Sequence, residues 1–196
     1  QSIFTIMANP VFFLCTISFR FGFGAMMSYI AASPFVGQSI LGMGQLPYAL
    51  SFAASASAII LANLLNSRLA VVYSVSTMFR VGAVLLTLAA ASFVVMETTD
   101  SLSIPGFAVT AFILTAGAGL TMSNANALGL AEATPSTRGA GAAVMGAAQF
   151  LLASLASPLV GLAGETSATP MVIVIAVLVG VSVLSGGLAR LRLAAR

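Results

Sequence analysis

Residues 166–189, TSATPMVIVIAVLVGVSVLSGGLA, contain no charged side chain. A helix needs about 20 mostly apolar residues to cross about 30 Å of membrane hydrocarbon, so this stretch is long enough for one crossing. Further charge-free stretches occupy most of the remaining chain: 1–19, 21–67, 81–96, 101–131 and 139–164. The stretch 21–67 has room for the rest of one span and the whole of a second. Together they predict about six spans.

The composition gives the same answer. Of the 196 residues, 60% are hydrophobic and 6% are charged, and the mean hydropathy is +1.12. Soluble domains carry roughly 25% charged residues, so this chain cannot cover a water-facing surface and must contact lipid. The runs are continuously apolar and do not alternate with polar residues, which favours helices over a β-barrel. We therefore expect an all-α membrane protein.

The predicted spans are separated by segments that contain turn-forming or helix-ending residues, such as Pro34, Asn66, Pro105, Pro135 and Pro170. Small residues recur at helical spacing in the second and fifth spans, which indicates close helix packing. The spans are 11–33, 46–66, 77–96, 104–130, 140–162 and 170–189, and we interpret them as one six-helix domain, 1–196.

The distribution of charge predicts the orientation, because cytoplasmic loops carry an excess of arginine and lysine. Basic residues occupy the second connection, the fourth connection and the C-terminal tail: Arg68, Arg80, Arg138, Arg190, Arg192 and Arg196. Acidic residues without a basic neighbour occupy the third and fifth connections: Glu97, Asp100 and Glu165. This pattern predicts that the N- and C-terminal ends of this segment both lie in the cytoplasm.

Arg20 is the most informative polar residue of the first span. It lies about nine residues from the predicted start of that span, or roughly 13 Å along a helix. An arginine at this depth is costly and normally faces a cavity or an anionic partner, so Arg20 is a candidate substrate-binding residue. The alternative is an arginine whose long stem lets the guanidinium reach the headgroups.

Amides inside spans are the next candidates, because an unsatisfied amide in lipid is expensive. Ser123, Asn124 and Asn126 lie in the fourth span and Gln149 lies in the fifth. Each must bond to another helix, to water in a cavity or to a substrate. Asn124 and Asn126 point about 200° apart on a helix, so the two cannot line one cavity.

The first span is also rich in aromatic residues and methionine, including Phe19, Phe21, Phe23, Met26 and Met27. Flexible methionine and flat rings suit a pocket for diverse apolar molecules, and Met27 is our candidate among them. Lipid-facing bulk is the alternative for at least half of this set.

The sequence does not contain the residues that a catalytic or metal site would need. The chain has no His and no Lys, its four carboxylates are scattered over three different connections, and its one cysteine, Cys15, lies in a span. These features exclude a Ser–His pair, a histidine metal site, a phosphate-binding loop with lysine and an intrachain disulfide. We expect no catalytic residue, no metal, no cofactor and, without a basic patch, no nucleic-acid partner.

Three segments carry a family resemblance: SYIAASPFVGQ at 28–38, LPYALSFAASASAIILANLLNSRL at 46–69 and NANALGLAEATPSTRGAGAAVMGAAQF at 124–150. They resemble the seventh helix, the eighth helix and the tenth-to-eleventh helix connection of the Bcr/CflA drug-resistance branch of the major facilitator superfamily. The resemblance runs in order over most of the chain. Asn124, Asn126 and Gln149 match polar positions of that pattern.

The resemblance implies proton-coupled export of amphipathic, drug-like molecules across a bacterial inner membrane by a protein of two six-helix halves. This chain, which begins with Gln, would be the C-terminal half, and its partners would be lipid, substrate, protons and the N-terminal six-helix half. The proton-carrying acid would lie in that other half. Two alternatives remain open: a truncated remnant that does not transport, and a facilitator that imports a small metabolite.

Overall fold

The computed structural model describes residues 3–161 and 167–195 and is helical almost throughout. The α-helices are α1 (Ile3–Met7), α2 (Pro10–Pro34), α3 (Gln45–Leu69), α4 (Val75–Thr98), α5 (Ile104–Ala131), α6 (Arg138–Leu159) and α7 (Thr169–Ala194), and a π-helical segment, η1 (Phe35–Ile40), follows α2. Six helices of the described residues are long and apolar enough to cross a membrane. The predicted all-α, six-span class is confirmed.

The first span differs most from its prediction, since the helix continues beyond Pro34 to Ile40 where we expected a loop. Proline has no N–H to donate within a helix, and the carbonyl of Ile30, four residues earlier, accepts from Oγ of Ser33 at 3.1 Å. A wider π-helical turn follows. In this turn Leu41 donates a 3.0 Å hydrogen bond to the carbonyl of Val36. Gly42, with a φ of 67°, then reverses the chain into α3.

At the other end, Asn9 caps α2 by accepting from the N–H groups of Val11 and Phe12.

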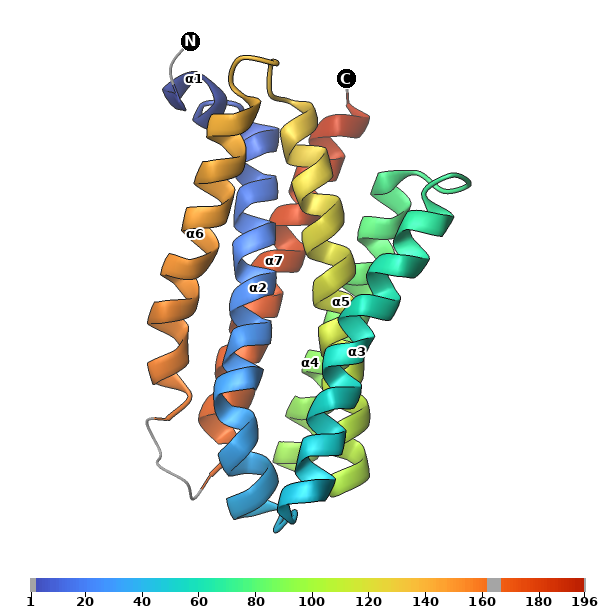
Figure 1. Ribbon diagram of the computed structural model, residues 1–196. Coiled ribbons are helices and arrows are strands. Elements are labelled where there is room, and N and C mark those ends of the chain that lie inside the picture. Colours follow the sequence, from blue (N-terminus) through green and yellow to red (C-terminus); the bar gives the residue numbers. More distant parts are fainter. Residues whose placement is uncertain (1–2, 162–166, 196) are drawn as a thin grey trace.

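The six long helices form three pairs (Figure 1). α2 and α5 are in the middle and pack on one another. α7 and α4 lie behind them, with α7 on α2, α4 on α5, and α4 and α7 in contact with each other. α6 and α3 lie in front and to the two sides, where α6 packs chiefly on α2 and α3 chiefly on α5. Because of this arrangement, α3 and α6 are the least buried of the six spans.

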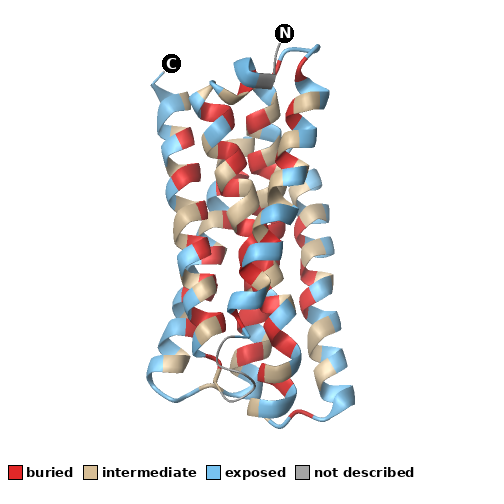
Figure 2. Ribbon diagram, turned by 90° about the vertical axis from the view of Figure 1, so that its left-hand side faces the viewer, coloured by how far each residue is buried: buried red, intermediate tan, exposed pale blue. Residues whose placement is uncertain are grey.

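Buried residues concentrate in α2 and α5 and along the helix seams between the middle and rear pairs (Figure 2). Glycines allow the closest of these approaches. A Cβ at Gly82 on α4 would lie 2.7 Å from the backbone nitrogen of Thr121 on α5, and one at Gly117 on α5 would lie 2.8 Å from the backbone nitrogen of Leu86. The α4–α5 seam therefore depends on residues without side chains, as is common where apolar burial does not drive helix association.

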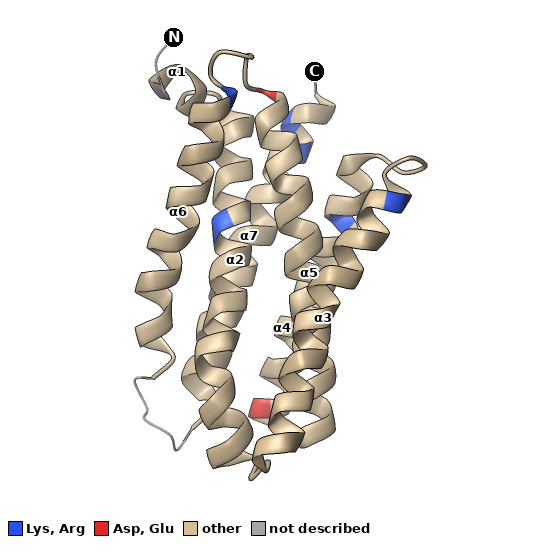
Figure 3. Cartoon of the chain, viewed as in Figure 1, with Lys and Arg blue, Asp and Glu red and all other residues tan. Residues whose placement is uncertain are grey.

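Most of the arginines lie at one end of the bundle, where one carboxylate, Glu132, lies beside Asn9 (Figure 3). The described N- and C-terminal ends lie at the same end of the bundle (Figure 1), together with the arginines of the two basic connections and of the end of α7. Glu97, in the last turn of α4, and Asp100, just after α4, lie at the opposite end. Arg196 and Glu165, which also entered the prediction of orientation, lie outside the described residues.

Candidate functional site

Arg20 and Gln149 lie at the same level of two adjacent helices, α2 and α6. The rings of Phe23 and Phe150 are in edge contact with their centroids 5.4 Å apart, and a Cβ at Gly24 would lie 3.2 Å from Leu152. Arg20 precedes Phe23 and Gly24 by three and four residues, and Gln149 precedes Leu152 by three. Residues three and four apart share a helix face, so Arg20 and Gln149 are one turn further along the same α2–α6 seam.

Both residues hold a buried polar atom without a hydrogen-bond partner among the described residues. These atoms are Nε of Arg20, a donor, and Oε1 of Gln149, an acceptor. The one contact shown for the Arg20 charge is with the neighbouring ring of Phe21, 5.4 Å from the ring centroid, which is within cation–π range. Buried polar atoms of this kind are costly in a membrane, so this place on the seam is suited to a polar ligand.

Met27 lies further along the same α2–α6 seam, where the side chains are apolar. It lies seven residues after Arg20 on α2, which is nearly two full turns and hence the same helix face. Met27 is half-buried and packs against the main core cluster, and the Phe23–Phe150 pair lies between its level and that of Arg20. The structure thus brings together three predicted site residues, Arg20, Gln149 and Met27, along a seam that is polar at one level and apolar at the next.

Asn124 belongs to a different seam, between α5 and α3. Its Nδ2 donates to Oδ1 of Asn66 at 2.9 Å and to the carbonyl of Leu120 at 2.8 Å. The preceding residue, Ser123, donates to Oδ1 of Asn63, one turn before Asn66 on α3. Both N–H groups of the Asn124 amide therefore donate to groups of the protein itself, one of them across the α3–α5 seam. Substrate binding by Asn124 stays a prediction.

Asn126 lies apart from Asn124, as its position on a helix predicts. It is half-buried, and no hydrogen bond from its side chain is shown within the described residues. Fourteen residues separate it from Phe112, so the two lie within about 40° of each other around α5. Phe112 is 38% exposed. Asn126 therefore lies on a partly exposed stripe of α5, and its role in substrate binding also stays a prediction.

Several polar contacts were not predicted from the sequence, because each involves a hydroxyl group that is unremarkable within an apolar run. Tyr29 on α2 and Ser55 on α3 are 3.0 Å apart, and Thr115 on α5 donates to the carbonyl of Ser55 at 2.7 Å. Ser182 on α7 donates to the carbonyl of Ser18 on α2 at 2.8 Å. These hydroxyl groups bond to groups on other helices of the protein, whereas Nε of Arg20 and Oε1 of Gln149 have no such partner among the described residues.

A separate cleft of about 380 Å³ opens at the acidic end, where the end of α4 meets the start of α7. Glu97 and Asp100 are among its lining residues, and Glu97 accepts a hydrogen bond from Thr169. A carboxylate held by the first residue of α7 ties the two helices together. None of the residues predicted to bind substrate lines this cleft.

These features define the class of protein: an all-α, multi-pass membrane protein with six spans and a partly polar seam between α2 and α6. Comparison with models of protein families, with curated proteins and with solved structures found no match for this chain.

Proposed function

We propose that this chain is the C-terminal half of a proton-coupled multidrug efflux transporter of the bacterial inner membrane. The observation that carries the proposal is the pair of unpartnered buried atoms, Nε of Arg20 and Oε1 of Gln149, at one level of the α2–α6 seam. A protein that only spans the membrane gains nothing from such atoms, because no hydrogen bond within the described residues offsets the cost of their desolvation. A transporter uses them to bind the polar part of its substrate.

The surroundings of this pair suit an amphipathic substrate. The guanidinium of Arg20 donates hydrogen bonds, whereas the amide of Gln149 both donates and accepts them. Beyond them along the seam lie the Phe23 and Phe150 rings and the flexible thioether of Met27. A molecule with an acceptor-bearing head and a flat apolar body matches this order of side chains, and methionine adapts to bodies of different shape.

The packing of α3 and α6 supports the role of a half. Each is joined to the bundle along one main seam, to α5 or to α2. The rest of each surface is apolar and contains small residues, including Ala53 and Ala54 on α3 and Ala142 and Ala143 on α6, all exposed. Small residues allow another helix to approach closely in lipid. A second six-helix unit placed here would enclose α2 and α5 between the halves, where transporters of this kind bind substrate near the midplane.

Proton coupling would then reside in the other half. The described carboxylates of this chain are Glu97 and Asp100 at one end and Glu132 at the other, where it accepts a 2.8 Å hydrogen bond from Asn9. None of the three lies midway along a span. The resemblance to the Bcr/CflA branch likewise implies an acid in the N-terminal half.

The test is drug susceptibility of cells that express the full reading frame, with and without a protonophore. We expect resistance that the protonophore abolishes. Arg20→Ala and Gln149→Ala should each remove resistance at unchanged expression, whereas Arg68→Ala, at the exposed end of α3, should retain it.

Three outcomes would overturn the proposal in different ways. Wild-type resistance in the Arg20→Ala and Gln149→Ala variants would show that the seam does not bind substrate. Accumulation of a small metabolite in place of drug export would favour an importer. A reading frame without six further spans upstream, with no transport, would favour a non-transporting remnant.

A further inference from the structure

Two contacts define the seam between α4 and α7, on the rear of the bundle. A Cβ at Gly186 on α7 would lie 2.1 Å from Cζ of Phe79 on α4, so the Phe79 ring occupies the space that a side chain would need. One turn nearer the end of the bundle, Nε of Arg190 donates a 2.7 Å hydrogen bond to Oγ of Ser76. These two contacts set the register of the antiparallel pair.

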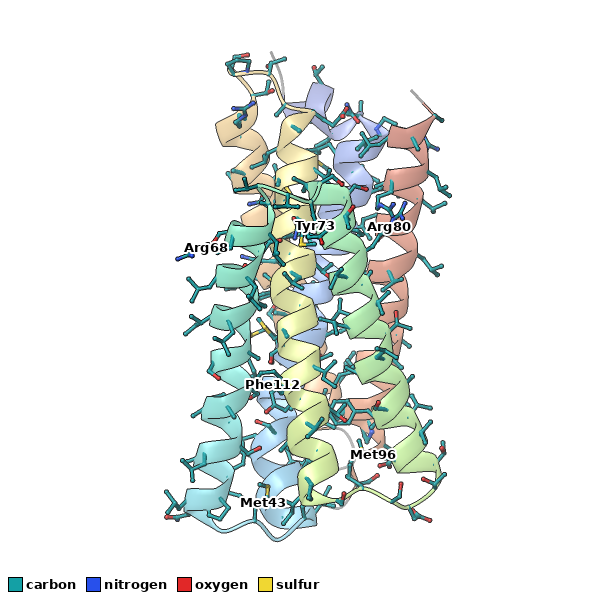
Figure 4. All side chains as sticks on the ribbon, turned by 90° about the vertical axis from the view of Figure 1, so that its right-hand side faces the viewer. Met43, Arg68, Tyr73, Arg80, Met96 and Phe112 are labelled. Atoms are coloured by element: carbon teal, nitrogen blue, oxygen red, sulfur yellow. The ribbon has the colours of Figure 1, made fainter. Side chains whose placement is uncertain are left out.

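This register places a second arginine beside Arg190. Arg80 follows Ser76 by four residues and so lies on the same face of α4, and Figure 4 shows it pointing toward α7. The positive charges of Arg80 and Arg190 repel each other across the seam. No carboxylate is shown against either residue in the described part of the chain, since Glu97 and Asp100 lie at the opposite end and Glu132 accepts from Asn9.

An apolar groove continues along the same two helix faces. It has a volume of about 400 Å³, and its lining includes Thr87, Ala91 and Val94 from α4 and Ala176, Gly180 and Val183 from α7. Thr87 follows Arg80 by seven residues and Val183 precedes Arg190 by seven. Seven residues make nearly two turns, or about 10 Å, so Thr87 and Val183 each lie about 10 Å along their own helix from its arginine, toward the middle of the membrane.

We propose that this seam is a binding site for an anionic phospholipid, with the phosphate between Arg80 and Arg190 and one acyl chain in the groove. A phosphate oxygen accepts from both guanidinium groups and removes the repulsion between them. Arginines near helix ends lie at the depth of the headgroups, and a groove lined by small residues below them is apolar, as an acyl chain requires. The site lies on the rear pair of helices, away from the α2–α6 seam, and does not depend on the transport proposal.

The test is native mass spectrometry of the purified chain in detergent with mixtures of phosphatidylglycerol and phosphatidylcholine. We expect the wild type to retain phosphatidylglycerol preferentially. Arg80→Gln and Arg190→Gln should each weaken retention about fivefold. This factor corresponds to the contribution of about 1 kcal/mol that one arginine makes to binding at an anionic membrane surface. Arg68→Gln is the matched control, because Arg68 lies at the end of α3 and points away from the bundle (Figure 4), and it should leave retention unchanged.

A second variant tests the groove while leaving the arginines intact. Gly180 lines the groove, and a Cβ there would meet no atom within 4 Å. Gly180→Leu adds bulk to the groove and should also release the lipid. Gly146→Leu on α6, where a Cβ is equally free, is its control. Equal retention in Arg80→Gln, Arg190→Gln and Arg68→Gln would overturn the proposal. Displacement of the lipid by inorganic phosphate alone would overturn the role of the groove.

Discussion

Asn124 on α5 donates a 2.9 Å hydrogen bond from its Nδ2 to Oδ1 of Asn66 on α3. Its second N–H bonds to the carbonyl of Leu120 in its own helix. α3 packs chiefly on α5, so this amide pair and the neighbouring Ser123–Asn63 bond hold α3 at the end of its one main seam.

The first prediction concerns the energy of this pair. In a double-mutant cycle with Asn124→Ala and Asn66→Ala, we expect a coupling free energy of about 0.6 kcal/mol and at most about 1.7 kcal/mol, the range measured for interhelical bonds in a membrane protein. The measurement is unfolding of the protein in mixed micelles by a denaturing detergent. The control cycle pairs Asn126→Ala with Asn66→Ala and should show no coupling. Equal coupling in both cycles would mean that the amide pair is not the source.

The second prediction concerns two glycines that differ in their surroundings. Gly82→Ala places a methyl group 2.7 Å from the backbone nitrogen of Thr121, and overpacking of this kind costs about 1–3 kcal/mol. At Gly187 on α7 a Cβ meets no atom within 4 Å. Gly187→Ala should therefore stabilise the protein, by up to about 1 kcal/mol, because alanine is the better helix former. Thermal unfolding in detergent should show a lower melting temperature for Gly82→Ala and a higher one for Gly187→Ala. An unchanged melting temperature in Gly82→Ala would contradict the close α4–α5 approach.

The third prediction concerns Cys15 and the orientation of the chain. Cys15 is 2% exposed, so thiol reagents should label the native wild type only after denaturation. In a Cys15→Ser background, Ser136→Cys and Ser101→Cys introduce thiols at exposed positions of opposite ends of the bundle. In intact cells, an impermeant maleimide should label the Ser101→Cys variant and spare the Ser136→Cys variant until the membrane is opened. The reverse order would place the arginine-rich end outside.

The spans and the shared end of the two described termini followed from the sequence because both depend on the spacing of charges along the chain. Pro34 shows where such reasoning fails. A loop is expected from this residue, but the chain stays helical to Ile40 through the π-helical segment that follows. Local chemistry allows both outcomes, and in the structure the helical continuation lies against α3.

Helix pairing could not be predicted in the same way. The charge-free spans are apolar on every side, so their periodicity does not indicate which face meets which neighbour. Ser18 and Ser182 are 164 positions apart and each is an isolated serine in an apolar run, yet they meet at the α2–α7 seam. Asn124 was correctly expected to need a partner, but the sequence could not identify Asn66. Likewise, Arg20 and Gln149 were singled out separately, and only the parallel packing of α2 and α6 brings them to one level.

The last prediction uses this pair. If Arg20 and Gln149 face a common space, Gln149→Glu supplies a carboxylate of the same length for the guanidinium of Arg20. We expect stabilisation of about 1.5–3 kcal/mol, the range for hydrogen bonds to charged groups. The same substitution in an Arg20→Gln background should instead destabilise the protein, because the new carboxylate is then buried without a cation. Thermal unfolding of the four proteins in detergent measures both effects.

The change of sign is the decisive result, since it cannot arise from residues that point apart. Were Arg20 directed to the headgroups and away from α6, Gln149→Glu would destabilise both backgrounds equally. The same geometry affects transport. The carboxylate introduced by Gln149→Glu binds the guanidinium of Arg20, which is then not available to the substrate. Drug resistance should therefore fall while the stability of the protein rises. Gln149→Leu, which removes the polar group without pairing Arg20, should lower resistance without this gain in stability.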